Sequence, residues 1–320
     1  MANLKDIHSL GIDPCWPSRQ TVVRWIEATT PWSMEQADAY NRRTDVKNVR
    51  NTLPTSSYDP VGFRQSGKAT ALALEGKPWE SAMASALGYQ LFGDKLKFFW
   101  HGQFRMLFPS HQQPLRMMNW SVMTETMAMA FVLGWEAEGI YQGYLTHAAL
   151  LQSYQLKESY ESHHRRGHAL MLRLFEEWRG DVSHIWPAFA YEQPIYEQLL
   201  KLWKEPDPEA LVPSLIAACD LHTHEALPDT EEVFHDFSNT PRTPLEILFL
   251  YRLRALSGLI NPVLNHPLME APFDRLPEAQ PPYKPDDLML GTLTRVHEDW
   301  PGFDAAVSLG AVKDATMPGM

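Results

Sequence analysis

The chain has few cysteines, a deficit of basic residues and no long apolar run. Only two of its 320 residues are cysteines, Cys15 and Cys219, and they are far apart and outside any CxxC pattern. The sequence therefore indicates neither a disulfide framework nor a cysteine-based zinc site, and free thiols fit a reducing compartment. Because 28 Lys and Arg stand against 39 Asp and Glu, the formal net charge is −11. This balance argues against a protein that binds nucleic acid directly through its phosphates.

Signals for export or membrane insertion are also missing. The N-terminal stretch MANLKDIHSLGIDPCWPSRQ lacks the basic start and apolar core of a signal peptide, and no later run has the apolar length of a membrane span. We therefore expect a cytoplasmic protein with no membrane partner. The hydrophobic share of 44% and the charged share of 21% are ordinary for a globular protein with a buried core.

Apolar residues recur at three- and four-residue spacing between residues 79 and 260, which is typical of packed helices. In TPRTPLEILFLYRLRALSG, Thr243 is the expected N-cap and Glu246 its partner in a capping box. Pro244 occupies the first helical position, and Gly258 lies near the end. Sustained alternation of apolar and polar residues is missing, so strands are not indicated. We predict an all-α protein.

We predict a single domain, residues 1–320, built of stacked helical hairpins with irregular N- and C-terminal segments. Residues 79–270 form the helical-hairpin core, and residues 1–78 add a polar segment with one or two short helices packed on it. Residues 271–320, rich in Pro and acids, form an extended segment. The stretches MASALGYQLFG and MAFVLGWEAEG share a spacing of small residues, which hints at an internal duplication with a glycine bend between paired helices.

The stretch CDLHTHEALPD raises the question of a metal site. Asp220, His222 and His224 would share one face of a strand, but in a helix residues two apart lie about 200° apart around the axis. The preceding Ala-rich sequence has apolar residues at helical spacing and favours a helix. We therefore expect His222 on a mostly buried face and His224 exposed, rather than a shared metal ion.

A second stretch, YESHHRRGHAL, has His164 and His168 four residues apart on one helical face. The Glu of the HExxH zinc pattern is missing, and two arginines flank the pair, so a solvated, mixed-charge helix start is the favoured interpretation. We expect no cofactor and no bound metal. The alternative is a metal-dependent hydrolase built from His164, His168, His222 and His224.

Motifs for phosphate binding and nucleophilic catalysis are incomplete. The stretch GFRQSGKAT from Gly62 has the G-x-x-x-x-G-K spacing of a phosphate loop, but Ala69 occupies the position of the Mg-binding Ser or Thr and no buried strand precedes it. A glycine-containing turn before a helix is the ordinary interpretation. There is neither a G-x-S-x-G elbow nor a glycine-framed cysteine. We therefore predict a protein that is not an enzyme.

The stretch EALPDTEEVFHDF, residues 225–237, contains five acids and neither Lys nor Arg. We predict that it is a loop between two helices that attracts a basic partner at long range, with a plain solvated surface as the alternative. The stretch GWEAEG is a smaller acidic instance. The candidate partner-binding residues are Glu225, Asp229, Glu231, Glu232, Asp236, Glu136 and Glu138.

The run YEQLLKLWKEPDPEALVPSLIAACDLHTHEA, followed by TPLEILFLYRLRALSGLINPVLNHPLMEAPFDRLPE, resembles the C-terminal half of an all-helical immunity-protein family, number forty-nine of the bacterial polymorphic toxin systems. The shared order is a helix ending in a short loop with Asp and Pro, a long helix with a late His, a Pro-started helix closing on a Gly, and an extended HPLM segment. The resemblance implies a non-enzymatic protein that neutralises a cognate secreted toxin, often a nuclease with a basic nucleic-acid-binding cleft. A helical-repeat scaffold that binds an unrelated protein is a further alternative.

Overall fold

The computed structural model describes residues 9–29, 33–42, 57–107, 118–151, 165–230 and 233–316. In these ranges the chain contains helices, turns and loops and no strand, so the predicted all-α fold is confirmed. The α-helices are α1 (Arg19–Glu27), α2 (Glu35–Arg42), α3 (Tyr58–Leu74), α4 (Glu80–Leu107), α5 (Trp120–Val132), α6 (Glu136–Leu151), α8 (Arg166–Arg179), α9 (Pro194–Leu202), α10 (Val212–His224), α11 (Leu245–Leu256), α12 (Asp287–Asp299), α13 (Phe303–Ala306) and α14 (Leu309–Asp314). Short 3-10 helices are η2 (Ala188–Tyr191), η3 (Pro208–Leu211) and η4 (Pro267–Met269).

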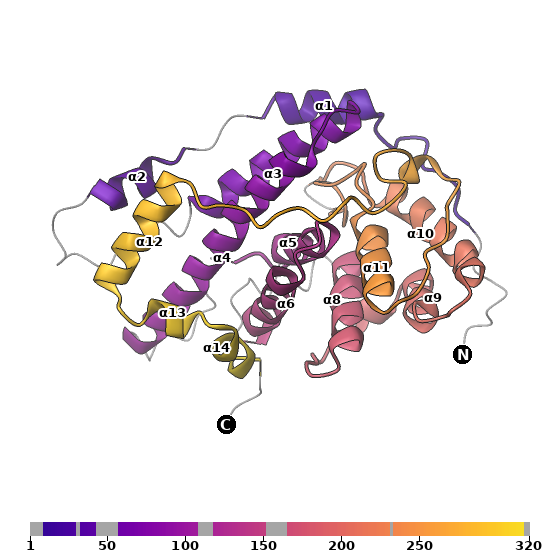
Figure 1. Ribbon diagram of the computed structural model, residues 1–320. Coiled ribbons are helices and arrows are strands. Elements are labelled where there is room, and N and C mark those ends of the chain that lie inside the picture. The colour runs from indigo at the N-terminus through magenta and orange to yellow at the C-terminus, as the bar shows by residue number, and fades with distance from the viewer. Residues whose placement is uncertain are drawn as a thin grey trace.

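Helices α3 and α4 form a closely packed antiparallel hairpin, on the left in Figure 1, that turns at Gly76 with φ of +72°. A Cβ atom on Gly62 of α3 would lie 2.6 Å from the carbonyl oxygen of Ala86 in α4. A Cβ atom on Gly93 of α4 would likewise lie 2.6 Å from the backbone nitrogen of Asp59. The two backbones approach this closely because both contact positions lack a side chain.

The phosphate-loop-like stretch GFRQSGKAT lies inside α3 and is helical throughout. The expected turn before a helix is therefore wrong, because Gly62 serves helix packing and not a turn. Helix α3 lies within residues 1–78, which were expected to carry only one or two short helices. It has 17 residues and pairs with α4, so the expected boundary after residue 78 falls in the connection within this hairpin.

Helices α5 and α6 form a second hairpin, in the centre of Figure 1, that turns at Gly134 with φ of +83°. A Cβ atom on Gly139 of α6 would lie 2.6 Å from the ring of Phe131 in α5, so glycine again permits close packing. The structure does not bear out the duplication. Residues 83–93 lie within the continuous helix α4, whereas residues 129–139 cross the turn between α5 and α6.

Residues 271–286 begin with a turn at 271–274, continue as an extended chain, and cross the molecule from the α10–α11 side to α12, as the orange chain in Figure 1 shows. We term this segment the C-terminal strap. Its Gln280 N–H donates to the carbonyl of Leu133 at 2.8 Å, and the Trp135 indole N–H donates to the Gln280 carbonyl at 3.0 Å. The Tyr283 ring occupies the space beside Gly88 of α4. The strap thus contacts both the α3–α4 hairpin and the α5–α6 hairpin.

The C-terminal segment is only partly extended, which differs from the expectation for residues 271–320. Helices α12, α13 and α14 follow the strap, and α12 begins with Asp286 accepting the N–H of Met289 at 2.9 Å. The Pro- and acid-rich composition belongs to the strap, while Met289 and Val296 provide the buried face of α12. None of the described helices combines the length and apolar character needed to span a membrane.

Two helix starts are informative for the site. Helix α10 begins at Val212, with Pro213 in its first turn, and contains the whole Asp-x-His-x-His sequence, as predicted. Helix α11 begins at Leu245, but the expected capping box is wrong. The Thr243 hydroxyl has no hydrogen-bond partner, and Glu246 binds a histidine of α10 instead.

Candidate functional site: an anchored acidic loop and an adjoining cavity

Residues 225–237 form a loop whose two ends meet, and we term it the acidic loop. The Phe237 N–H donates to the Glu225 carbonyl at 2.7 Å, and the Asp236 N–H donates to Glu225 Oε2 at 3.3 Å. The side chain of Asp236 accepts the N–H of Gly167, in the first turn of α8, at 2.5 Å. These bonds hold the base of the loop against α8 and α10.

Asp236 does not lie on a partner-facing surface, and this corrects the prediction for that residue. Its exposed fraction is 4%, and burial raises the pKa of its carboxyl to about 6, against the opposing effect of the His168 charge. A carboxylate beside the N-terminus of a helix satisfies otherwise unpaired N–H groups and interacts favourably with the helix dipole. Asp236 is therefore an anchor of the loop.

Near the tip of the acidic loop, the described residues 229, 230 and 233 are exposed, and residues on its two sides are hydrogen-bonded to one another. Asp229 accepts the N–H of His235 at 2.8 Å, and the Thr230 N–H donates to the Val233 carbonyl at 2.9 Å. The side chains of Asp229 and Val233 are exposed. Two further predicted contact residues in this loop, Glu231 and Glu232, lie outside the described residues.

Phe237 anchors the loop through two buried histidines. Its ring stacks on His222, with centroids 4.2 Å apart and planes at 10°, and also on His168 at 6.1 Å and 28°. His222 Nδ1–H donates to Glu246 at 2.9 Å, and His168 Nε2–H donates to Glu125 at 3.0 Å. Each histidine therefore packs against Phe237 and donates a hydrogen bond to a different carboxylate.

The described histidines among the metal-ligand candidates, His168, His222 and His224, bind separate partners. Within the described part of the chain, no group of three or more His, Cys, Asp and Glu residues could hold a metal ion. His222 is fully buried, and the partly exposed His224 binds the N-terminal segment through the Gly11 carbonyl at 2.9 Å and Asp13 at 3.0 Å. The fourth candidate, His164, lies outside the described residues.

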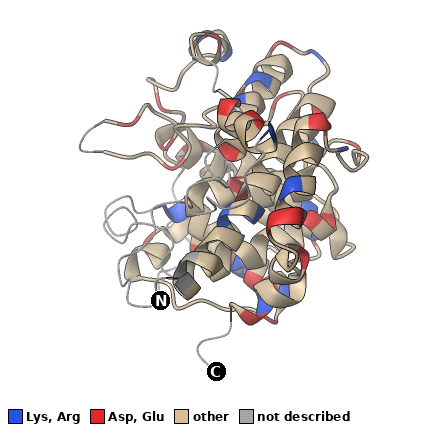
Figure 2. Cartoon of the chain, turned by 90° about the vertical axis from the view of Figure 1, so that its left-hand side faces the viewer, with Lys and Arg blue, Asp and Glu red and all other residues tan. Residues whose placement is uncertain are grey.

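Glu136 and Glu138 lie in the first turn of α6, next to the C-terminal strap. Glu136 is exposed. Glu138 is half-buried, and its charge opposes the lowering of the Lys95 pKa that burial causes. Both positions also suit a helix N-terminus, where acidic side chains interact favourably with the helix dipole. In the view of Figure 2, acidic and basic residues are interspersed along the helices rather than separated onto two faces.

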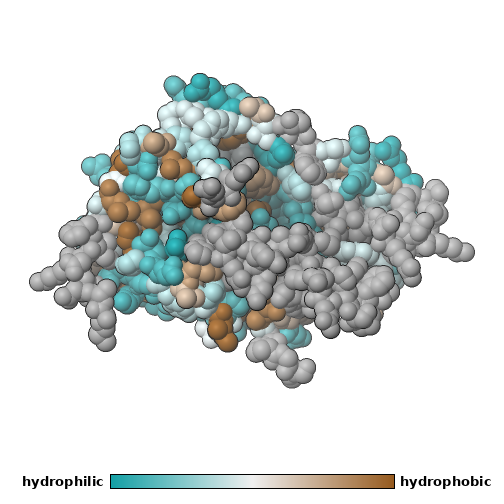
Figure 3. Space-filling view, turned by 180° about the vertical axis from the view of Figure 1, so that it is seen from behind, coloured by the Kyte–Doolittle hydropathy of each residue, from teal (hydrophilic) through white to brown (hydrophobic). Residues whose placement is uncertain are grey.

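A cavity of about 400 Å³ adjoins the acidic loop, between α1, α3, α4, α5 and residues 238–245. Seen from behind in Figure 3, the surface is hollowed below α1, and apolar residues border the hollow. Apolar side chains from several helices line it, among them Trp25 of α1, Phe63 of α3 and Met129 of α5. Its polar lining includes Arg64, Lys68, Gln90, Glu125, Asn239, Thr240 and Thr243.

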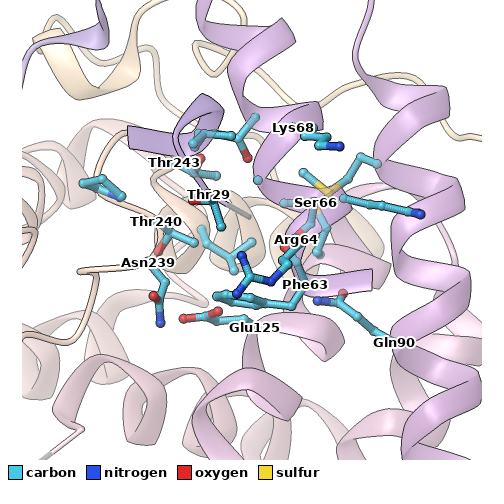
Figure 4. A pocket seen from close by; sticks show the side chains of 18 of the residues that line it. Thr29, Phe63, Arg64, Ser66, Lys68, Gln90, Glu125, Asn239, Thr240 and Thr243 are labelled. Atoms are coloured by element: carbon cyan, nitrogen blue, oxygen red, sulfur yellow. Dashed lines mark hydrogen bonds between the residues drawn. The ribbon is translucent and has the colours of Figure 1, made fainter. Parts of the chain in front are cut away.

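The polar residues that line the cavity come from separate elements. Figure 4 shows Arg64 of α3, Glu125 of α5 and Asn239 of the loop before α11 around the same opening. Glu125 accepts a hydrogen bond from the buried His168. The hydroxyl oxygens of Thr240 and Thr243 are buried without a hydrogen-bond partner. Sequence reasoning missed this cavity because no motif links residues so widely separated along the chain.

Comparisons with known proteins give no relative from which to transfer a function. No protein-family model, curated protein or solved structure matches the chain.

Proposed function

We propose that the protein is an immunity protein, made in the cytoplasm of a toxin-producing bacterium, that binds and neutralises a cognate antibacterial toxin. The observation that carries this proposal is the construction of the acidic loop, whose base is anchored in the core while Asp229 and Val233 near its tip are exposed. In this proposal the tip covers the basic nucleic-acid-binding cleft of a nuclease, and neutralisation needs no catalytic step.

An anchored loop suits tight binding because little conformational freedom is lost when a partner docks. Arg165 donates to the His235 carbonyl at 2.6 Å and so places a positive charge beside the base of the loop. The negative charge of Asp229 is at the tip, where Val233, 51% exposed, adds an apolar contact surface. The tip therefore combines long-range attraction with a site for close packing.

The order of elements in the C-terminal half also supports the proposal. Helix α9 is followed by a short loop with Asp207, α10 ends at His224, and α11 runs from just after Pro244 to just before Gly258. The HPLM segment differs from the resemblance, because Pro267–Met269 form the 3-10 helix η4 rather than an extended segment.

Co-expression in bacteria tests the function. The adjacent open reading frame of the source genome is induced with and without this protein, and the complex is then isolated by pull-down. We expect growth arrest that this protein abolishes, together with a stoichiometric complex. A harmless neighbour that forms no complex would contradict the proposal and favour a scaffold role.

A charge-neutralised variant tests the interface. Because Asp236 is an anchor, the variant changes only Asp229→Asn, Glu231→Gln and Glu232→Gln, and asparagine keeps the oxygen that accepts the His235 N–H. We expect the association rate with the toxin at low salt to fall about fivefold and to depend less on salt. The control neutralises Glu35, Glu298 and Asp314, three exposed carboxylates on α2, α12 and α14. Equal rates for variant and control would reject the acidic loop as the interface.

A further inference from the structure

The cavity beside the acidic loop has the size and lining of a small-molecule site. Its volume of about 400 Å³ falls within the range of roughly 300 to 1,000 Å³ that is usual for ligand pockets. Trp25, Phe63 and Met129 form part of its apolar wall, and the polar groups come from α3, α4, α5 and residues 238–243. A mostly apolar wall with a few convergent polar groups is typical of ligand sites.

The charge of the lining is opposite in sign to that of the protein. The lining contains two bases, the half-buried Arg64 and the exposed Lys68, and one acid, Glu125, although the whole chain carries −11. Glu125 is 11% exposed at its side chain and already accepts a hydrogen bond from buried His168 at 3.0 Å. The cavity thus favours a negatively charged ligand over a positively charged one.

Two hydroxyl groups in the lining lack the partners that buried polar groups normally have. The hydroxyl oxygen of Thr243 is buried without a hydrogen bond, and the residue as a whole is 1% exposed. The Thr240 hydroxyl is also buried and unpaired, and both residues line the cavity. An unpaired buried hydroxyl costs free energy, so a ligand that accepts hydrogen bonds would be favoured here.

We propose that this cavity binds a small organic carboxylate with an apolar body. The guanidinium of Arg64 supplies the charge for the carboxylate, since arginine matches the two oxygens of that group. The hydroxyls of Thr240 and Thr243 donate to the same oxygens, and the apolar body lies against the wall that includes Phe63 and Met129. The proposal is independent of the immunity function, because it uses none of the residues at the tip of the acidic loop.

Calorimetric titration of the full chain with three matched probes tests the ligand class. The probes are 4-phenylbutyrate, 4-phenylbutyramide and 4-phenylbutylamine, which share an apolar body and differ in the charge of the end group. We expect the carboxylate to bind at one site, at least tenfold more tightly than the amide, and the amine to bind most weakly. Equal affinities, tighter binding of the amine, or no binding of any probe at millimolar concentration would overturn the proposal.

Three variants locate the binding in this cavity. Thr243→Val keeps the shape of the side chain and removes the hydroxyl, and we expect it to fold normally and to bind the carboxylate about tenfold more weakly. Arg64→Gln should remove the preference for the carboxylate over the amide. Lys77→Gln, a control in the α3–α4 turn outside the cavity lining, should bind as the parent does. Unchanged binding by folded Thr243→Val and Arg64→Gln would show that the ligand binds elsewhere.

Discussion

Burial raises the pKa values of two aspartate carboxyls, Asp94 and Asp236. Asp94 of α4 is 4% exposed and accepts a hydrogen bond from Gln142 Nε2 at 2.6 Å. Burial raises the pKa of Asp94 to about 7, because the opposing effects of Lys97 and Gln142 are smaller and the Asp59 charge adds to the rise. Asp94 and the loop anchor Asp236 thus both bind protons more readily in the folded protein than in the unfolded chain.

The titration of Asp94 predicts a pH dependence of stability. An unfolded carboxyl titrates near pH 4, so between about pH 4 and 7 the folded state binds more protons and the free energy of unfolding falls as pH rises. We expect Asp94→Asn, which retains an oxygen to accept the Gln142 amide, to remove about 2 kcal/mol of the decrease between pH 5 and 7.5. Urea denaturation of both proteins at these two pH values measures it. An identical pH dependence in the variant would contradict the raised pKa.

The two aspartates of the acidic loop should differ in their effect on stability. Asp236→Ala leaves the Gly167 N–H buried without its acceptor, and we expect a loss of about 2 kcal/mol. Asp229→Ala removes one exposed hydrogen bond to His235, and we expect a loss below about 0.5 kcal/mol. Thermal and urea unfolding measure both changes. Equal losses would contradict the assignment of Asp236 as the anchor.

At the scale of the elements, glycines in α3 show how context decides a residue's role. Gly62 faces α4, where a Cβ atom would lie 2.6 Å from a carbonyl oxygen. Gly67, also in α3, faces Ile26, and a Cβ atom there would make an ordinary contact at 3.7 Å. One glycine is required by helix packing, and the other only lowers the helix propensity of α3.

Alanine substitutions at these two positions should have opposite effects. Gly62→Ala forces α3 and α4 apart, and we expect it to destabilise the protein by about 2 kcal/mol. Gly67→Ala should stabilise it by about 0.5 to 1 kcal/mol, because alanine loses less backbone entropy in a helix. Denaturant unfolding of the pair supplies matched measurements. A destabilising Gly67→Ala with a neutral Gly62→Ala would contradict the packing of this hairpin.

The helices also differ in how well the local sequence predicts their features. The helical spacing before Asp220 correctly predicted α10 and the burial of His222, because a periodic apolar face is a local signal, whereas His224 was expected to be exposed and is only partly so. The capping box at Thr243 failed because Glu246 instead accepts a hydrogen bond from the buried imidazole of His222. His222 is 24 residues from Glu246 in the sequence, so a local pattern does not predict this hydrogen bond.

At the scale of the whole molecule, the C-terminal segment contributes buried residues to the core. Phe273 of the strap packs edge-on against Trp79, which directly precedes α4 in the α3–α4 connection, with ring centroids 5.6 Å apart. Phe303 of α13 packs against Phe99 of α4 at 5.0 Å, and Val296 and Val312 are fully buried. Removing this segment would expose apolar surface on both hairpins.

A chain that ends at residue 270 should therefore fail to form a stable monomer. We expect it to aggregate, or to bind a hydrophobic dye and unfold without a cooperative transition, because the apolar partners of α4 are lost. The complete chain is the control and should unfold in one transition. Size-exclusion chromatography and thermal unfolding distinguish the two. A soluble and cooperatively folded 1–270 chain would show that the C-terminal segment is dispensable.

By itself the sequence determined the helical class, the position of α10 and the acidic character of residues 225–237, because periodicity and charge are properties of neighbouring residues. Only the tertiary structure decided that Asp236 is an anchor, that α3 belongs with α4, and that polar residues from α3 and α5 share a cavity with the loop before α11. These outcomes depend on which surfaces meet when the helices pack. Burial, partner choice and enclosed volume arise from contacts between segments far apart in the chain, which a local pattern does not encode.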